Sequence, residues 1–164
     1  NIKYLNKMTK AIFPGTFNPI TNGHINIAHR AVNIFDEVII AISEKRNEEL
    51  LLTANERLIL INEVFSNTKN IRTIIFNGLV TDLARDESAK FIVRGVRTLI
   101  DFDYELKMAD MNKKLYCDIE TIFLTPEEGF NNISSSLVRE ISASGGDVSS
   151  FVPPVVQQAL KDKL

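Results

Sequence analysis

Cysteine and histidine are scarce in this sequence of 164 residues, which has one cysteine and two histidines. The single cysteine, Cys117, has no partner for an intrachain disulfide, and the small number of both residue types argues against a structural metal site. A lone cysteine is most often a small core or boundary residue rather than a catalytic nucleophile. We therefore expect neither disulfides nor metal ligands in this protein.

Net charge and long apolar runs are also lacking. Lysine and arginine number 19 and aspartate and glutamate 21, which gives a formal net charge of −2. This balance implies no general surface for polyanions, so no nucleic acid partner is expected and any phosphate binding must be local. No apolar run approaches the roughly 20 residues of a membrane span, and residues 1–10 lack the apolar segment of a signal peptide. We expect a cytoplasmic protein with no membrane partner.

The length of the chain predicts one domain with a sizeable core, and no repeat, low-complexity tract or linker interrupts it. Met8 is suited to be the initiator. We therefore interpret residues 8–164 as the domain and residues 1–7 as an N-terminal extension or an artificial remnant.

Short apolar runs alternate with longer segments of helical periodicity. The runs predict strands over residues 11–13, 38–42, 71–76, 91–93 and 119–124. Most of them lack polar alternation, as expected of parallel strands that are buried on both faces. Strands separated by helices form βαβ units. The sequence thus predicts an α/β fold, with a Rossmann-like, doubly wound sheet of five parallel strands.

Helices are predicted between these strands and at the end of the chain. They begin near His24, Thr53, Asp101, Ser134 and Pro154. A capping box at Thr53 opens the second helix, Asp101 is expected to cap the third, and Pro154 suits the first turn of the last. Loops that follow the strands, over 15–19, 43–47, 77–80, 94–97 and 125–132, contain the unusual residue clusters. Because ligands bind beyond the carboxyl ends of such strands, we expect one active site there.

His24 lies at the first turn of a predicted helix, where the positive helix end disfavours imidazolium. A neutral ring there can donate a hydrogen bond to a phosphoryl oxygen, although a purely structural hydrogen bond is the alternative. His29 falls on the polar face and is interpreted as a surface residue. Upstream, Gly15 and Thr16 form either a simple turn or a place where the backbone approaches a ligand.

Two further clusters have the chemistry of phosphate binding. Arg94 and Arg97 flank Gly95 at the end of a buried strand, where guanidinium groups bind phosphate or simply provide surface charge. Residues 134–136 are three serines, which either cap a helix or cradle a triphosphate. No Ser–His–acid arrangement is evident, so nucleophilic catalysis is not expected. Glu105 is expected to reach a ribose or a loop amide.

Residues 14–24, 94–97, 101–105, 111–112 and 133–136 together closely resemble the bacterial phosphopantetheine adenylyltransferases. The Thr21-x-Gly23-His24 pattern alone identifies only the (H/T)xGH nucleotidyltransferase superfamily. The resemblance extends over nearly the whole chain, from about residue 10 to residue 159. It implies transfer of the adenylyl group of ATP to 4′-phosphopantetheine, which gives 3′-dephospho-coenzyme A and pyrophosphate in the penultimate step of coenzyme A synthesis.

The resemblance also implies how the reaction proceeds. The acceptor phosphate attacks the α-phosphorus of ATP in line, without a covalent intermediate, so catalysis rests on positioning and charge stabilisation. Mg²⁺ is expected to arrive with ATP, held largely by phosphates and water. A homohexamer is expected, with coenzyme A as a feedback inhibitor at the same site.

Residue roles follow from the same resemblance. His24 and Thr16 are expected to be catalytic, and Thr16, Val80 and Arg94 to bind the acceptor, with Leu79 along the pantetheine arm. ATP is expected to contact Thr16, Phe17, His24, Gly95, Val96, Arg97, Glu105, Phe130, Asn131, Asn132, Ile133, Ser134, Ser135 and Ser136.

The chain departs from the family pattern at two positions beside the site. Asn18 replaces the usual aspartate, where we expect the side chain to shape the loop. Glu48 aligns with a lysine that contacts the acceptor and the transferred phosphate in relatives. Because a carboxylate repels phosphates, our hypothesis is that Lys45 or Arg46 supplies the cation instead.

Two other functions fit parts of the pattern. One is another nucleotidyltransferase, acting on nicotinate mononucleotide or on a polyol phosphate with CTP, although those relatives usually have His-x-Gly-His where this chain has Thr21. The other is a non-catalytic sensor of nucleotides or coenzyme A on the same fold. A competition experiment tests the first alternative, because a phosphopantetheine adenylyltransferase should bind ATP and not CTP. A His24 variant tests the second alternative, because an enzyme should lose turnover whereas a sensor has none to lose.

Overall fold

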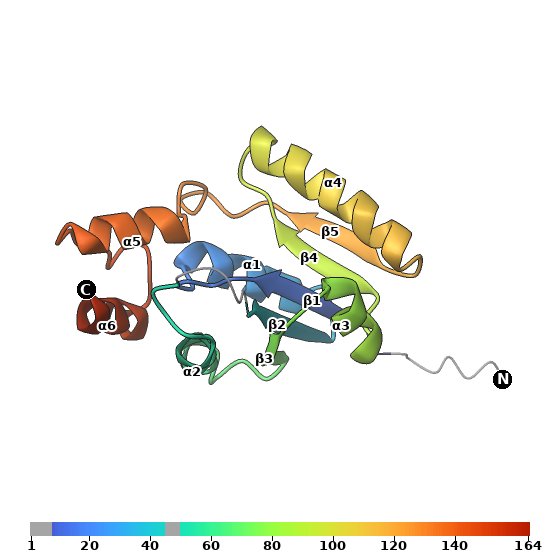
Figure 1. The fold of residues 1–164 in the computed structure, drawn as a ribbon, viewed down its shortest axis with the longest axis horizontal. Coiled ribbons are helices and arrows are strands. Elements are labelled where there is room, and N and C mark those ends of the chain that lie inside the picture. Colours follow the sequence, from blue (N-terminus) through green and yellow to red (C-terminus); the bar gives the residue numbers. More distant parts are fainter. Residues whose placement is uncertain (1–7, 45–49) are drawn as a thin grey trace.

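The computed structural model describes residues 8–44 and 50–164, so residues 1–7 and their interpretation as an extension lie outside it. In the described residues the chain forms five strands and six helices (Figure 1). They are β1 (Lys10–Gly15), α1 (Asn22–Val32), β2 (Glu37–Ser43), α2 (Ala54–Val64), β3 (Ile71–Phe76), α3 (Val80–Asp86), β4 (Phe91–Gly95), α4 (Leu99–Leu115), β5 (Glu120–Leu124), α5 (Ser135–Ala143) and α6 (Pro154–Lys163). None of these helices is both long and apolar enough to cross a membrane.

All five strands pair in parallel, in the order β3-β2-β1-β4-β5. The chain builds outward from β1 to β3 and then returns to add β4 and β5 on the other side of β1. This arrangement confirms the predicted doubly wound α/β fold. The direction of winding reverses between β1 and β4, which is the point where open α/β sheets bind their ligands.

Helices cover both faces of the sheet (Figure 1). Successive side chains of a strand point to opposite faces, so Phe13 of β1 packs in the core beneath α1, α2, α5 and α6, whereas Ile12 packs in a smaller core beneath α3. β1 and β2 have buried interiors, but β3 and most of β5 are only half-buried. Burial on both faces, expected for most of the strands, is therefore found in the middle of the sheet and not at its edges.

Three local predictions were wrong in detail. Asp101 does not cap α4, because the Thr98 hydroxyl accepts the backbone N–H of Asp101 and Thr98 is the capping residue. Cys117 is exposed rather than in the core or at its boundary. The short helix α3 was not expected, since no side chain caps its first residue, Val80, and seven residues give little periodicity. The capping box at Thr53 is confirmed.

Candidate active site

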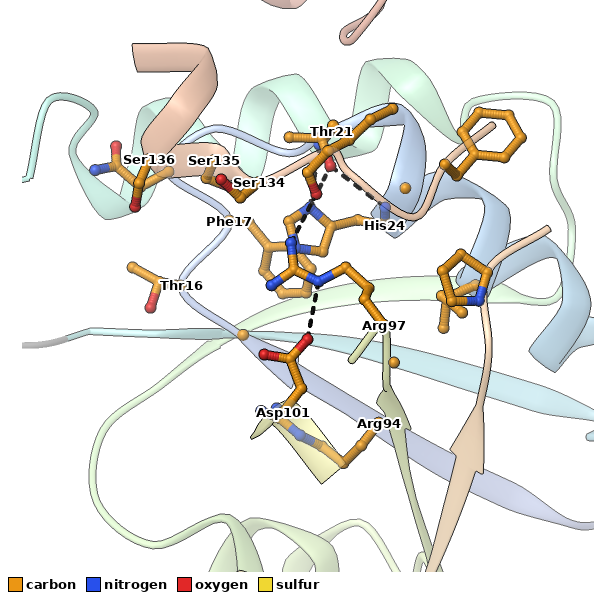
Figure 2. Close-up of a pocket in the computed structure, with 18 of the residues that line it drawn as sticks. Thr16, Phe17, Thr21, His24, Arg94, Arg97, Asp101, Ser134, Ser135 and Ser136 are labelled. Carbon is orange, nitrogen blue, oxygen red and sulfur yellow. Dashed lines mark hydrogen bonds and ion pairs between the residues drawn. The ribbon is translucent and has the colours of Figure 1, made fainter. Parts of the chain in front are cut away.

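A cavity of about 730 Å³ lies over the carboxyl ends of β1 and β4, which we call the main pocket (Figure 2). The first turns of α1, α4 and α5 close its sides. Its lining comprises Phe13, Pro14, Gly15, Thr16, Phe17, Asn18, Thr21, Gly23, His24, Ile27, Leu50, Arg94, Gly95, Arg97, Ile100, Asp101, Tyr104, Glu105, Pro126, Phe130, Ile133, Ser134, Ser135, Ser136 and Arg139.

A second cavity of about 330 Å³, the side pocket, extends toward the ends of β2 and β3. Ser43, Phe76, Val80 and Met108 belong to its lining, which also includes residues of the main pocket. Thr16 is among the residues that line both cavities. The two pockets together bring the ends of all five strands to one place, as the sequence predicted.

The start of α1 fixes the orientation of His24. The backbone N–H of Thr21, the capping residue, donates to Nδ1 of His24 at 3.1 Å, and the Thr21 hydroxyl lies 3.0 Å from the same nitrogen. Because Nδ1 accepts this hydrogen bond, the neutral ring carries its proton on Nε2. His24 therefore offers an Nε2–H donor to whatever occupies the main pocket.

The surroundings of His24 keep it neutral. Burial is the main cause that lowers the pKa of His24 to about 4, and the positive charges of Arg97 and Arg94 lower it further. Its ring packs edge-on against Phe17, with centroids 5.1 Å apart. The neutral ring predicted from sequence is confirmed, but its main cause is burial and not the helix terminus.

The loop after β1 has a strained backbone. Phe17 has a φ of +50°, a conformation that residues other than glycine rarely adopt. Its ring fills the space beside Gly15, where an added Cβ would lie 2.8 Å from the Phe17 ring. Gly15 is thus required for packing within the loop, and it also lines both cavities, so a close approach of its backbone to a ligand stays a prediction.

Two arginines extend from the end of β4 into the main pocket (Figure 2). Arg94 forms a two-point ion pair with Glu105, at 2.6 and 2.5 Å, and donates to the Pro14 carbonyl at 2.7 Å. Arg97 pairs with Asp101 at 3.2 Å and donates to the Ile133 carbonyl at 2.9 Å. Arg94, rather than a loop amide, therefore engages the Glu105 carboxylate.

The serine segment before α5 forms the far wall. Ser134 caps the helix by accepting the backbone N–H of Leu137 at 3.2 Å. Ser135 donates its hydroxyl to the Pro19 carbonyl at 2.7 Å. Among the described residues, no hydrogen bond uses the backbone N–H of Ser135 or Ser136. Both N–H groups lie at a helix N-terminus, which suits the binding of an anion.

Most of the residues predicted for the site come together. The main pocket contains Thr16, Phe17, His24, Arg94, Gly95, Arg97, Glu105, Phe130, Ile133, Ser134, Ser135 and Ser136. Val80 lines the side pocket. Val96 is buried, Leu79 and residues 131–132 are exposed, and none of these four residues lines either pocket.

Of the two positions where the chain departs from the family pattern, the structure describes Asn18 but not Glu48. Asn18 is buried, and its side-chain oxygen accepts the backbone N–H of Leu52 at 3.0 Å, so it shapes the loop as expected. Lys45, Arg46 and Glu48 lie outside the described residues, so the hypothesis of a substitute cation stays a prediction.

Sequence reasoning missed three side chains at or behind the pockets. Tyr104 lines both cavities, and Arg139 lines the main pocket and donates to the Asn18 carbonyl at 2.5 Å. Arg57 is buried behind the loop after β1 and donates to the Thr16 carbonyl. Arg139 stands three residues after the serines, a spacing that puts it on their side of the helix, whereas nothing local in the sequence signals the contact of Arg57.

The chain is similar to known proteins over most of its length. The cytidylyltransferase-like family matches residues 12–141. Curated phosphopantetheine adenylyltransferases are 44% identical in Paraburkholderia xenovorans, over 96% of this chain and 92% of the relative, and 45% identical in Herminiimonas arsenicoxydans, over 96% of both chains. The same enzyme of Vesicomyosocius okutanii is 46% identical over 94% of this chain and 98% of the relative.

A solved structure supports the fold independently. The crystal structure of a putative nicotinate-nucleotide adenylyltransferase from Vibrio parahaemolyticus superposes with a TM-score of 0.71 over 95% of this chain and 93% of that chain. Its sequence identity is 18%, so the likeness concerns the fold alone.

Proposed function

The chain belongs to the cytidylyltransferase-like family and, within it, to the phosphopantetheine adenylyltransferases, and from this membership we propose how its pockets perform the reaction. The enzyme transfers the adenylyl group of ATP to 4′-phosphopantetheine. The products are 3′-dephospho-coenzyme A and pyrophosphate, in the penultimate step of coenzyme A synthesis.

We propose that ATP occupies the main pocket and that the pantetheine arm lies in the side pocket. The side pocket combines the apolar side chains of Val80, Phe76 and Met108 with polar residues such as Ser43 and Asn112, a mixture that suits a narrow arm carrying both alkyl and amide groups. Thr16 and Arg94 line both cavities, so the acceptor phosphate and the α-phosphate of ATP meet beside them. This arrangement supports direct in-line attack without a covalent intermediate.

His24 then stabilises the charge that develops on the α-phosphate. Its Nε2–H donates to a non-bridging oxygen, and the low pKa of the ring keeps this donor in its neutral form at physiological pH. Arg97 and the N–H groups of Ser135 and Ser136 hold the outer phosphates, because they combine a guanidinium with a helix N-terminus.

Mg²⁺ enters this proposal as a companion of ATP. No group of three or more acidic, histidine or cysteine side chains in the described residues could hold a metal ion. Arg97 and Arg94 engage the carboxylates of Asp101 and Glu105 beside the pocket. The phosphates of ATP and water therefore supply most of the ligands of the ion.

The observation that carries the proposal is the fixed, neutral His24 in a pocket rich in phosphate-binding groups. We expect His24→Ala to lower kcat by about 10²–10³-fold, because removal of one preorganised donor has this effect. ATP affinity, measured by calorimetry, changes much less. His29→Ala is the matched control, since His29 is exposed on the same helix. A sensor, in contrast, shows no turnover for His24→Ala to reduce.

We further propose a homohexamer that coenzyme A inhibits by occupying the same pockets. The exposed apolar side chains of α4, among them Leu99, Leu106, Met111 and Leu115, support self-association. Light scattering on the purified chain tests this oligomeric state, and a single chain in solution contradicts it.

Competition between coenzyme A and ATP in a binding assay tests the proposed inhibition. We place the enzyme in the cytoplasm, where ATP is available.

A further inference from the structure

Arg57 of α2 is a buried arginine outside both pockets. It is 2% exposed. Burial lowers the pKa of its guanidinium, which reflects the loss of water that hydrogen bonds must replace. Among the described residues, every hydrogen bond that Arg57 donates goes to a main-chain carbonyl oxygen. A charged donor buried in this way fixes the peptide groups that it contacts.

The carbonyl groups belong to segments that meet behind the active site. Nη1 of Arg57 donates to the Thr16 carbonyl at 2.6 Å and to the Ser43 carbonyl, at the end of β2, at 3.1 Å. Nε donates to the carbonyls of Leu52 at 3.2 Å and Thr53 at 3.3 Å, just before α2. Arg57 thus joins the loop after β1 to the end of β2 and to the start of its own helix.

The contact with Thr16 sets the direction of one peptide group. In a trans peptide the C=O and the following N–H point in opposite directions. Because the Thr16 carbonyl is turned toward Arg57, behind the loop, the N–H of Phe17 is turned away from Arg57. In the described residues no hydrogen bond uses this N–H. Phe17 also has the left-handed φ, which a surrounding structure must hold in place.

We propose that Arg57 is a positioning residue for adenylyl transfer, which holds the Thr16–Phe17 peptide so that its N–H and the Thr16 side chain face the reacting phosphates. The inference rests on the proposed function, because it concerns the same site. Asn18 assists from the same side, since its side chain accepts the N–H of Leu52, the residue whose carbonyl Arg57 also holds.

The test compares Arg57→Met and Arg57→Lys with wild type and with Arg72→Met. Arg72 is the control because it makes ion pairs with Glu37 and Glu87, away from both pockets. For each variant, kcat and the KM values for ATP and 4′-phosphopantetheine are measured well below its own unfolding temperature. This condition separates loss of positioning from loss of folded protein.

We expect Arg57→Met to lower kcat by about 100-fold, the scale of an active-site misplacement of about 1 Å, with little change in KM for 4′-phosphopantetheine. Arg57→Lys keeps the positive charge but replaces the planar guanidinium by a single ammonium nitrogen, so we expect a loss of about 10-fold. This variant carries the test if Arg57→Met does not fold. Arg72→Met unfolds at a lower temperature but keeps its kcat. A folded Arg57 variant with wild-type kcat overturns the inference alone, whereas a wild type without turnover overturns the proposed function and the inference together.

Discussion

At the scale of single residues, the chemistry depends on a histidine that stays neutral. The same hydrogen bond from Thr21 that completes the cap of α1 fixes the tautomer of His24. Protonation of Nδ1 would set a second donor against the Thr21 N–H, so the cap and the low pKa support each other. Helix capping and catalysis thus use one contact.

This account predicts the titration of His24. The chain has two histidines, so proton NMR shows two Hε1 ring signals, which His29→Gln assigns. We expect the His24 signal to be constant from pH 8 to 5 and to shift with a midpoint near the pKa of about 4. As the pH falls from 6.5 toward 4, the unfolded chain takes up this proton before the folded chain does, so folding stability decreases over that range. A midpoint near the ordinary value of 6.5 contradicts a neutral His24 held away from water.

Residues of the site were predictable where their role depends on local sequence. His24, Thr16 and the three serines stand directly after strands or at helix starts, so their positions follow from the element boundaries. Arg57 was not predictable, because its contact with Thr16 joins residues 41 positions apart in sequence and depends on how α2 packs. The pairing of Arg94 with Glu105 likewise depends on the path of α4 beside β4.

At the scale of elements, strands were easier to predict than helix starts. Buried apolar runs such as that of β2 are continuous, and the structure extends them by only a residue or two. The helix starts at α2, α5 and α6 were correct, because a capping box, a capping serine and a first-turn proline mark them. The start of α4 was wrong because both Thr98 and Asp101 are suitable caps, and only the backbone conformation selects between them.

The corrected cap gives a prediction about stability. Thr98→Ala removes the hydroxyl that accepts the N–H of Asp101, so it should lower the free energy of unfolding by about 1 kcal/mol. Asp101→Ala removes an ion pair of Asp101 with Arg97 that is about one-third exposed and should cost less. Urea unfolding of both variants measures the difference. The reverse ranking would restore Asp101 as the cap.

At the scale of the whole molecule, the topology decides where the chemistry occurs. Reversal of the winding between β1 and β4 leaves a gap above the sheet, into which the loops of both strands open as the main pocket. The side pocket continues toward β2 and β3. The sheet therefore lines up two cavities, a larger one rich in phosphate-binding groups and a smaller one with a mixed apolar and polar lining, with Thr16 at their junction.

The most direct test of the central claim is to incubate the purified chain with Mg²⁺, 4′-phosphopantetheine and either ATP or CTP, and to measure both products. We predict pyrophosphate and 3′-dephospho-coenzyme A in equal amounts with ATP, and neither pyrophosphate nor a cytidylyl product with CTP. Binding of ATP or coenzyme A without any product would contradict the account and identify a sensor on the same fold. Transfer from CTP would instead identify another nucleotidyltransferase.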